Sequence, residues 1–342
     1  MNYNETSESN RAAYSAVRDG GAGLIDLSAR GRILVSGADA QMFLNGLITN
    51  DMKTLARNSW MPAAFANVQG RLIAVVRVLH REDGYLIDTE AATRDFVIKL
   101  LERFTLAGDF RVTDVSSEIA TLSLQGREAA EIIASAFGRE SSEIGHNEAS
   151  NLKLGDGPTV TIIRATNTGE DGYHFFVETA DAQRLGDLLN ATGVMQVDEE
   201  VAETLRIEAG IPRFGIDMDQ TTVIPEINLE EAVSDTKGCY LGQEIIVRIK
   251  HRGHVAKKLT GIVFENEHQV EKDAKIFSLD DQEIGRMTST TFSPRLSRRI
   301  ALAYLKYDYL TPGIEVKVLA QGEKTAASVV ELPFVRGSWY RD

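Results

Sequence analysis

Residues 82–85 read Glu-Asp-Gly-Tyr, and the same four residues return at positions 170–173, an offset of 171 − 83 = 88. Each copy lies between two runs of β-forming residues, and Asp-Gly is a strong signal for a hairpin turn. Upstream, residues 33–40 match residues 122–129 at a nearly equal offset, 126 − 37 = 89 between their glycines. Both of these segments read as a strand, a glycine turn and an amphipathic helix. The chain therefore contains an internal duplication.

The duplication predicts two α+β halves packed around a pseudo-twofold axis, whose junction is a natural place for a ligand cleft. We expect repeat units at about 31–105 and 120–192, interleaved in a body that spans residues 20–255. Past that body, short β-like runs separated by turn residues predict a small all-β barrel or sandwich at residues 256–342. The expected fold class is thus α+β: a pseudo-duplicated α/β body followed by a C-terminal all-β domain.

The composition is that of an ordinary globular protein, with 43% hydrophobic and 25% charged residues. The net charge of −13 argues against broad binding to nucleic acid. No apolar run approaches the roughly 20 residues that span a bilayer, and residues 1–10 lack the features of a signal or transit peptide. The single cysteine cannot form an internal disulfide, which fits a reducing compartment. We therefore expect a cytoplasmic protein with no membrane partner.

The only cysteine of the chain lies in the run Lys-Gly-Cys-Tyr-Leu-Gly-Gln-Glu at residues 237–244. A basic run follows at residues 248–258, with no carboxylate after Glu244 until beyond Lys258. Nearby positive charge stabilises a thiolate and makes a cysteine reactive. Lone cysteines are more often small buried hydrophobes, and charge runs are often only solvated surfaces. The glycines and the Gln-Glu pair favour a shaped loop over a core strand.

The run at 237–244, followed by Arg252-Gly253, resembles the signature of the YgfZ-type folate-binding proteins. These are relatives of the glycine-cleavage T-protein, an aminomethyltransferase, and their mitochondrial counterparts assist iron–sulfur cluster assembly. The resemblance covers roughly residues 20–335. Further matching segments, at residues 49–51 and 205–212, occur in the same order along the chain as in the family. It implies a T-protein-like folate-binding body followed by a C-terminal β-barrel, with tetrahydrofolate or a one-carbon derivative as the cofactor. It also implies client iron–sulfur proteins or the cluster assembly machinery as partners.

A folate requires a carboxylate for its pterin N–H groups, apolar walls for its rings and a cation for its glutamate tail. Glu170 is the first carboxylate candidate, because its turn resembles the folate-contacting region of aminomethyltransferases; a plain hairpin turn is the alternative. Arg206 and Glu208, spaced i and i+2, face different sides of a helix, so that one could reach the cleft while the other forms a structural ion pair. Asp26 either caps a helix or lines the pocket.

The remaining candidates are grouped by their expected roles. We expect Cys239 to act as a thiolate or transient ligand, with Lys237 as its catalytic partner. Asn67 and Tyr173 complete the expected cofactor contacts. The residues expected to support the motif are Gly238, Tyr240, Gly242, Gln243, Glu244, Arg248 and Arg252.

The chain departs from the aminomethyltransferases after residues 70–73. Those enzymes resemble it there and carry acidic residues next, one of which assists proton movement at the folate. Here the corresponding residues are Ala74 and Val75. General acid–base catalysis requires a titratable group within reach. The sequence therefore does not decide whether this transferase-like chain is an enzyme.

Three functions remain in competition. The main hypothesis is a tetrahydrofolate-binding accessory protein in iron–sulfur cluster assembly or repair, which uses Cys239. The alternative is a folate-dependent aminomethyltransferase. The second alternative is a factor associated with tRNA modification through residues 248–258, disfavoured by the net charge and the absence of aromatic residues between the basic ones. The six histidines lack the spacing of a metal site, so no resident metal is expected.

Overall fold

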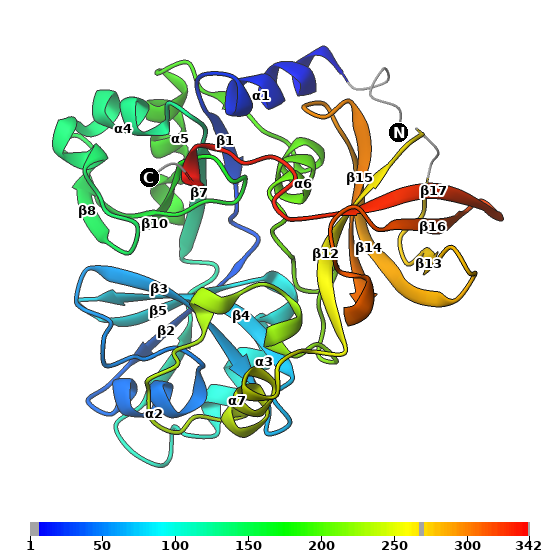
Figure 1. Cartoon of the computed structure of the whole chain (residues 1–342). Coiled ribbons are helices and arrows are strands. Elements are labelled where there is room, and N and C mark those ends of the chain that lie inside the picture. The colour runs from blue at the N-terminus through cyan, green and yellow to red at the C-terminus, as the bar shows by residue number, and fades with distance from the viewer. Residues whose placement is uncertain (1–6, 267–269, 341–342) are drawn as a thin grey trace.

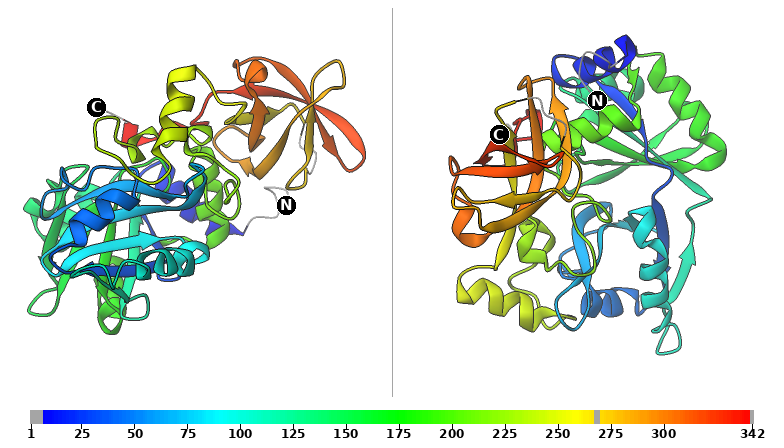
Figure 2. Two further views of the ribbon diagram at one scale, coloured as in Figure 1. Left: turned by 90° about the horizontal axis from the view of Figure 1, so that it is seen from below. Right: turned by 90° about the vertical axis from the view of Figure 1, so that its right-hand side faces the viewer.

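The computed structural model describes residues 7–266 and 270–340, except for the side chains of residues 250–252. Two α/β halves and a barrel lie around a common centre (Figure 1 and Figure 2). No helix in the described part of the chain is long and apolar enough to cross a membrane.

The first half is a five-stranded sheet in the order β3-β4-β5-β2-β6. Its apolar residues alternate along the strands, and the inward set packs beneath two helices around Leu44, Phe65 and Val97. The hairpin predicted at residues 82–85 is present between β4 and β5. The elements are β2 (Gly31–Ser36), α2 (Ala40–Leu47), β3 (Ser59–Ala66), β4 (Leu72–Arg81), β5 (Gly84–Thr89), α3 (Ala91–Glu102) and β6 (Arg111–Asp114).

The second half is a six-stranded sheet in the order β11-β1-β7-β10-β9-β8. Its strand β1 precedes the whole first half in the chain, so the two halves are interleaved. The pairing of β7 with β10 is antiparallel, as is that of β2 with β5, which is what a duplicated unit requires. The elements are β1 (Gly23–Asp26), β7 (Ile119–Gln125), α4 (Ala129–Phe137), β8 (Ala149–Lys153), β9 (Thr159–Arg164), β10 (Gly172–Glu178), α5 (Ala182–Asn190) and β11 (Met195–Gln196).

The second copy of the repeated tetrapeptide does not form the tight hairpin that its Asp-Gly pair predicts. Residues 165–171 form a longer loop between β9 and β10. The Asp171 carboxylate accepts hydrogen bonds from the Arg164 guanidinium, with Nε–Oδ1 at 2.8 Å, and these close the base of the loop. An ion pair across the loop therefore replaces the local turn.

The two sheets face each other across a shared layer. Alternation along β10 directs Tyr173 and Phe175 into the core of the second half and Phe176 towards the first half. Phe176 packs there with Trp60 and Leu79 of the first half. Any residue on the Phe176 side of β10 thus lies at the junction between the halves.

The C-terminal part is a closed barrel in the order β12-β15-β14-β13-β16-β17. Together with the two α/β halves it confirms the expected fold class. The sequence did not indicate β17, because that strand is built from small and charged residues, with Glu323 and Lys324 exposed at its start. The strands are β12 (Lys257–Phe264), β13 (Lys275–Phe277), β14 (Glu283–Ser293), β15 (Arg298–Lys306), β16 (Glu315–Ala320) and β17 (Glu323–Val330).

Helices α1 (Glu8–Arg18) and α6 (Glu199–Glu208) lie between the second half and the barrel (Figure 1). A long connection follows α6 and leads to α7 (Gln243–Arg252), which lies beside the first half. The 3-10 turns are η2 (Arg139–Ser142), η3 (Thr179–Asp181), η4 (Ile224–Glu226), η5 (Glu230–Ala232), η6 (Tyr307–Tyr309) and η7 (Ser338–Tyr340).

Candidate functional site

Residues 237–242, which contain Cys239 and which we call the cysteine loop, are held against the first half by Lys237. Its ammonium group donates hydrogen bonds to the carbonyl oxygens of Asn45, Ile48 and Asn50 at 2.7, 2.9 and 2.7 Å. These carbonyls lie at the C-terminal end of α2 and just beyond it, where the helix leaves acceptors unsatisfied. Burial lowers the pKa of Lys237 to about 8, while the carboxylate of Asp51 opposes that change.

This geometry corrects the prediction that Lys237 is catalytic. All three donors of the ammonium group are used by backbone acceptors, so none is directed at a reactant. The lysine is a positioning residue. Cys239, two residues further along, is exposed, as expected for a shaped loop and contrary to the buried alternative.

Gly242 is required where the loop turns into α7. Its φ of 85° is left-handed, and a Cβ there would lie 2.6 Å from the carbonyl oxygen of Asn67. The Asn67 side chain accepts hydrogen bonds from the backbone N–H groups of Gln69 and Arg71, which shapes the turn beneath the loop. Asn67 therefore supports the cysteine loop, and its side-chain oxygen is not directed at a folate.

The other motif residues divide between packing and surface. Tyr240 is buried, with the ammonium of Lys237 5.0 Å from its ring centroid. Gly238 has open space around it. Gln243 and Glu244 form the first turn of α7. Arg248 is exposed on the same helix, and the side chain of Arg252 lies outside the described residues.

The basic run at residues 248–258 spans two elements of the fold. Its last two residues already belong to β12 of the barrel. There Lys257 lies 4.8 Å from the ring centroid of Tyr304, and Lys258 pairs with Glu230 at 3.5 Å. The charge run is thus divided between α7 and the barrel.

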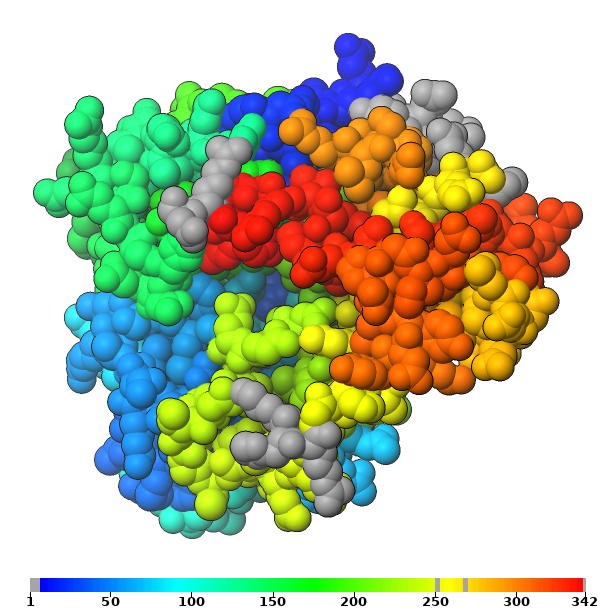
Figure 3. Space-filling model, in the orientation of Figure 1, coloured from blue at the N-terminus to red at the C-terminus, as the bar shows by residue number. Residues whose placement is uncertain are grey.

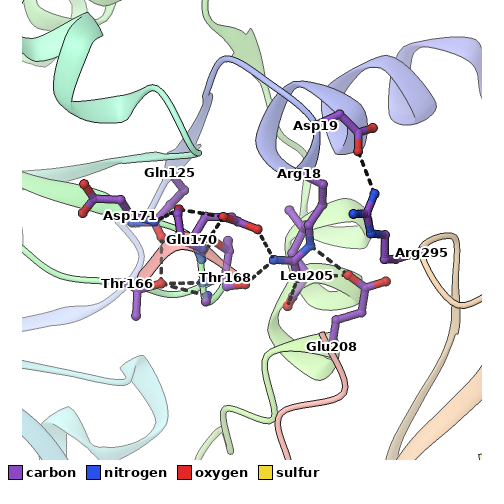
Figure 4. Close-up of polar contacts among 12 residues, drawn as sticks. Arg18, Asp19, Gln125, Thr166, Thr168, Glu170, Asp171, Leu205, Glu208 and Arg295 are labelled. Carbon is purple, nitrogen blue, oxygen red and sulfur yellow. Dashed lines mark hydrogen bonds and ion pairs between the residues drawn. The ribbon is translucent and has the colours of Figure 1, made fainter. Parts of the chain in front are cut away.

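Glu170 and Glu208 lie in a closed network with Arg18, which we call the Arg18 hub (Figure 4). Arg18 donates to Glu170 Oε1 at 3.1 Å and to Glu208 Oε2 at 2.9 Å. The three side chains are 1%, 3% and 0% exposed. Tyr14 and Ser293 also donate to Glu208, and burial together with Glu208 raises the pKa of the Tyr14 phenol.

The hub corrects the expectation that Glu170 and Glu208 contact a folate. Both carboxylates are surrounded by protein donors, and they join α1, the 165–171 loop, α6 and the barrel. Each of the four carboxylate oxygens already accepts a hydrogen bond from a protein donor, so none is left for a ligand. The alternative reading of Glu170 as a plain hairpin residue is also wrong.

Arg206 takes part in a separate network that faces the barrel. It donates to Asp217 at 2.7 Å and to Ser289 Oγ at 2.8 Å, and it pairs with Glu203 along α6. Arg206 and Glu208 therefore do face different sides of the helix, as their spacing predicts. Neither side reaches a cleft, because each carries an interdomain contact.

Two further expected folate contacts lie away from any cavity. Asp26 is exposed at the end of β1, and its carboxylate accepts a hydrogen bond from the Ser28 N–H at 2.8 Å. That contact makes it a turn residue. Tyr173 lies in the core of the second half, on the face of β10 that is directed away from the junction.

The junction between the halves holds a polar cluster, which consists of Arg77, Asp88, Asn167 and His174. Arg77 donates to Asn167 Oδ1 at 2.8 Å and to Asp88 at 3.3 Å, which connects β4 to the loop of the second half. His174 is on the Phe176 side of β10 and is fully buried. Neither of its ring nitrogens has a hydrogen-bond partner within residues 7–266 and 270–340.

His174 is held neutral by its surroundings. Burial lowers its pKa well below the ordinary value, and the positive charges of Arg77 and Arg30 lower it further. A neutral imidazole presents one N–H donor and one bare nitrogen acceptor. A buried polar group without a partner is costly, so this side chain marks a place where a ligand can supply the missing hydrogen bonds.

A cavity of about 340 Å³ opens at the same junction. In the β3–β4 ladder Pro62 of the cavity wall is the direct partner of Arg77, and directly paired residues share one face of a sheet. The indole N–H of Trp60, in the same wall, is buried without a partner among the described residues. The lining residues are Asn50, Thr54, Leu55, Ala56, Ser59, Trp60, Met61, Pro62, Asn147 and Glu231.

Asn50 connects this cavity to the cysteine loop. Its side-chain amide donates to the carbonyl oxygens of Pro62 and Glu231, while its own carbonyl accepts from Lys237. One residue therefore contributes to the cavity wall and to the anchor of the loop. The motif and the junction belong to one continuous structure.

Residues 74 and 75 lie on opposite faces of β4. Ala74 is fully buried in the core of the first half. Val75 is on the same face as Arg77, two residues further on, and packs against Ile207 and its neighbours. An acid at residue 75 would face the junction, whereas the valine places no titratable group there.

Sequence reasoning missed Arg18, Arg77 and His174. One signal for His174 was available, because the repeat offset aligns it with Leu86 of the first copy (174 − 88 = 86). The first repeat has a buried leucine at this strand position. A histidine in its place therefore indicates a buried polar group with a functional role. Arg18 and Arg77 have no comparable local signal, since their partners are far away in sequence.

Comparisons with known proteins agree with this architecture. The model of the GCVT N-terminal domain matches residues 2–237, and that of the glycine cleavage T-protein C-terminal barrel domain matches residues 257–336. A protein named aminomethyltransferase from Listeria monocytogenes serotype 4b (strain F2365) is 31% identical over 331 residues, covering 95% of this chain and 90% of the relative. Another from Bacillus mycoides (strain KBAB4) is 30% identical over 331 residues, covering 95% and 89%.

Among solved structures, the glycine cleavage system aminomethyltransferase T from Bartonella henselae has the same fold. The TM-score is 0.84 at 23% sequence identity, over 94% of this chain and 88% of the other. The resemblance to the T-protein superfamily is thereby confirmed, whereas its narrower YgfZ-type form stays a prediction. By its two domains and by its relatives along nearly its full length, the chain belongs to the glycine cleavage T-protein family.

Proposed function

We propose that this protein binds tetrahydrofolate or a one-carbon derivative at the junction between its halves, and that it acts through Cys239 as an accessory factor in iron–sulfur cluster assembly or repair. The observation that carries the folate site is His174, a buried imidazole with both ring nitrogens unpartnered in the described structure. It faces the same junction as a cavity that Trp60 lines, and it is not itself one of the lining residues.

The chemistry of the junction suits a reduced pterin. The edge of a pterin carries both N–H donors and acceptors, so it can satisfy either the donor or the acceptor nitrogen of a neutral imidazole. Trp60 and Pro62 supply an apolar wall, and the indole N–H of Trp60 has no partner in the described part of the chain. At about 340 Å³ the cavity is at the small end of ligand pockets, so a ring system fits while the glutamate tail projects outward.

Cys239 suits a role in which it is one ligand among several. A cluster normally has four protein ligands, and this chain has a single cysteine. The thiol is exposed and its loop is fixed by Lys237, so a client protein can approach it directly. The client would supply the remaining ligands.

Aminomethyl transfer is the second candidate, and the comparisons favour it because the curated relatives carry that name. The side chains argue against it. The resemblance places the acid that assists proton movement at residues 74 and 75, and here Ala74 and Val75 cannot accept or donate a proton. Among the described side chains of the basic run, Lys257 lies over the Tyr304 ring and Lys258 pairs with Glu230, and neither contact favours the tRNA-associated alternative.

A pair of assays separates the two candidates. The purified protein is supplied with tetrahydrofolate and an aminomethylated carrier protein, and methylene-tetrahydrofolate is measured; we expect none above background. Cells that lack the native factor are then complemented with wild type and with Cys239→Ser, and we expect only wild type to restore cluster-enzyme activity. Robust methylene transfer, or full complementation by Cys239→Ser, would overturn the proposal in favour of the transferase.

A further inference from the structure

After β17 the chain leaves the barrel and crosses to the second half (Figure 3). We call residues 335–340 the C-terminal strap. Val335 donates its backbone N–H to the carbonyl of Glu208 at 3.0 Å, and Trp339 donates to the carbonyl of Gly169 at 3.2 Å. Ser338 donates twice to Glu170 Oε2, from its N–H and from its hydroxyl, both at 2.7 Å. The strap is thus attached to the 165–171 loop.

The strap also packs beside one wall of the junction cavity. The Trp339 ring stacks on His146 with centroids 4.3 Å apart, and the next residue, Asn147, lines the cavity. Burial raises the pKa of the Tyr340 phenol, and the charge of Glu231, a residue that lines the cavity, raises it further. None of residues 335–340 lines the cavity itself, but Trp339 packs on the residue next to one that does.

Beyond Val335 the strap is held mainly by polar contacts, and Gly337 is the one buried residue of 336–340. Ser338, Trp339 and Tyr340 are only partly buried, and they form a single 3-10 turn. Segments with few buried apolar contacts open locally at a smaller free energy than the core. Glu170 would stay in place when the strap lifts, because Arg18 holds its other oxygen from within the hub.

We propose that the C-terminal strap is a lid on the junction cavity. It lifts from Gly169 and Glu170 to admit a planar ring, and it closes with Trp339 stacked on His146. The identity of that ring as a reduced folate rests on the proposed function, whereas the motion of the strap does not.

Hydrogen exchange followed by mass spectrometry tests the motion without a ligand. We expect the amides of Ser338 and Trp339 to exchange at least ~100-fold faster than those of β10, because they open without global unfolding. Saturating 5-formyltetrahydrofolate should slow the strap amides ~10-fold or more and leave exposed loops of the barrel unchanged. Exchange of the strap at the same rate as β10 would overturn the lid.

Gly337→Ala tests the coupling to binding, since a Cβ there would lie 2.3 Å from the Gly169 carbonyl oxygen and prevent the strap from seating. The matched control is Gly186→Ala on α5, where a Cβ meets nothing within 4 Å. We expect Gly337→Ala to raise the dissociation rate of 5-formyltetrahydrofolate at least ~10-fold and the control to leave it unchanged. Ser338→Ala, which adds no bulk, should raise it by a smaller factor and replaces Gly337→Ala if that variant does not fold.

The outcomes are distinguishable. Unchanged dissociation in both strap variants, with Trp339 more accessible to acrylamide quenching, would refute the lid while leaving folate binding intact. If wild type binds no folate at all, the proposed function fails, and hydrogen exchange alone then decides the lid: local opening supports it and core-like protection overturns it.

Discussion

Replacing Arg18 with methionine should be among the most destabilising single changes in the described structure. The arginine is the counter-charge of both Glu170 and Glu208, and the three side chains are almost fully buried. Methionine fills a similar volume but leaves two carboxylates facing each other without a cation. Breaking a buried ion pair by removing one partner costs about 3–5 kcal/mol, and here two carboxylates lose that partner. We expect a loss of about 4 kcal/mol or more in the free energy of unfolding.

Urea denaturation, followed by circular dichroism and by tryptophan fluorescence, measures this loss. The double variant Arg18→Met with Glu208→Gln removes one of the stranded charges, so it should be at least about 1–2 kcal/mol more stable than Arg18→Met alone. The surface arginine Arg295, which pairs with Asp19 at 3.2 Å and is half-exposed, is the control, and Arg295→Met should cost less than about 1 kcal/mol. Equal effects of Arg18→Met and Arg295→Met would refute the hub as a structural centre.

Three further predictions concern the cysteine loop. Lys237→Met leaves buried carbonyls without donors, so it should cost about 2–3 kcal/mol in unfolding free energy and hasten proteolysis of residues 237–244; unchanged protection there would contradict its role as an anchor. Gly242→Ala should cost at least about 2 kcal/mol by the same denaturation assay, because of its left-handed φ and the close Asn67 carbonyl, whereas Gly238→Ala, in open space, should be nearly neutral. Cys239→Ser should leave stability and folate affinity unchanged and abolish rapid alkylation; a loss of folate affinity would show that the thiol belongs to the ligand site instead.

The duplicated body was predictable because local patterns repeat in the sequence. Strand alternation and the segment 82–85 fix one hairpin without distant partners. The second copy at 170–173 follows the same local rule, but a contact between Arg164 and Asp171 overrides it. Strand β17 was not predicted, because its local sequence pattern is weak. Its pairing with the neighbouring strands β12 and β16 determines its conformation.

The candidate site was less predictable, because residue types do not reveal their partners. Glu170, Arg206 and Glu208 are residue types that can bind a folate. In the fold, each of them is already paired with buried groups from distant segments of the chain. Only the fold shows that His174 has no hydrogen-bond partner among the residues that the structure describes. Cys239 was identified correctly as an exposed loop residue, since glycines and polar neighbours are local signals.

Calorimetric titration of 5-formyltetrahydrofolate into wild type and His174→Leu tests the central claim most directly. Leucine is the residue at the equivalent position of the first repeat, Leu86, so it suits the strand. It also removes a buried unpaired polar group, and the free energy of unfolding should therefore stay the same or rise by about 1 kcal/mol. The folate affinity should fall about 30- to 100-fold, which corresponds to roughly 2–3 kcal/mol for the lost hydrogen bonds.

His254→Leu, outside the junction, should bind as wild type does. Unchanged folate affinity in a stable His174→Leu protein would contradict the assignment of the folate site to the junction.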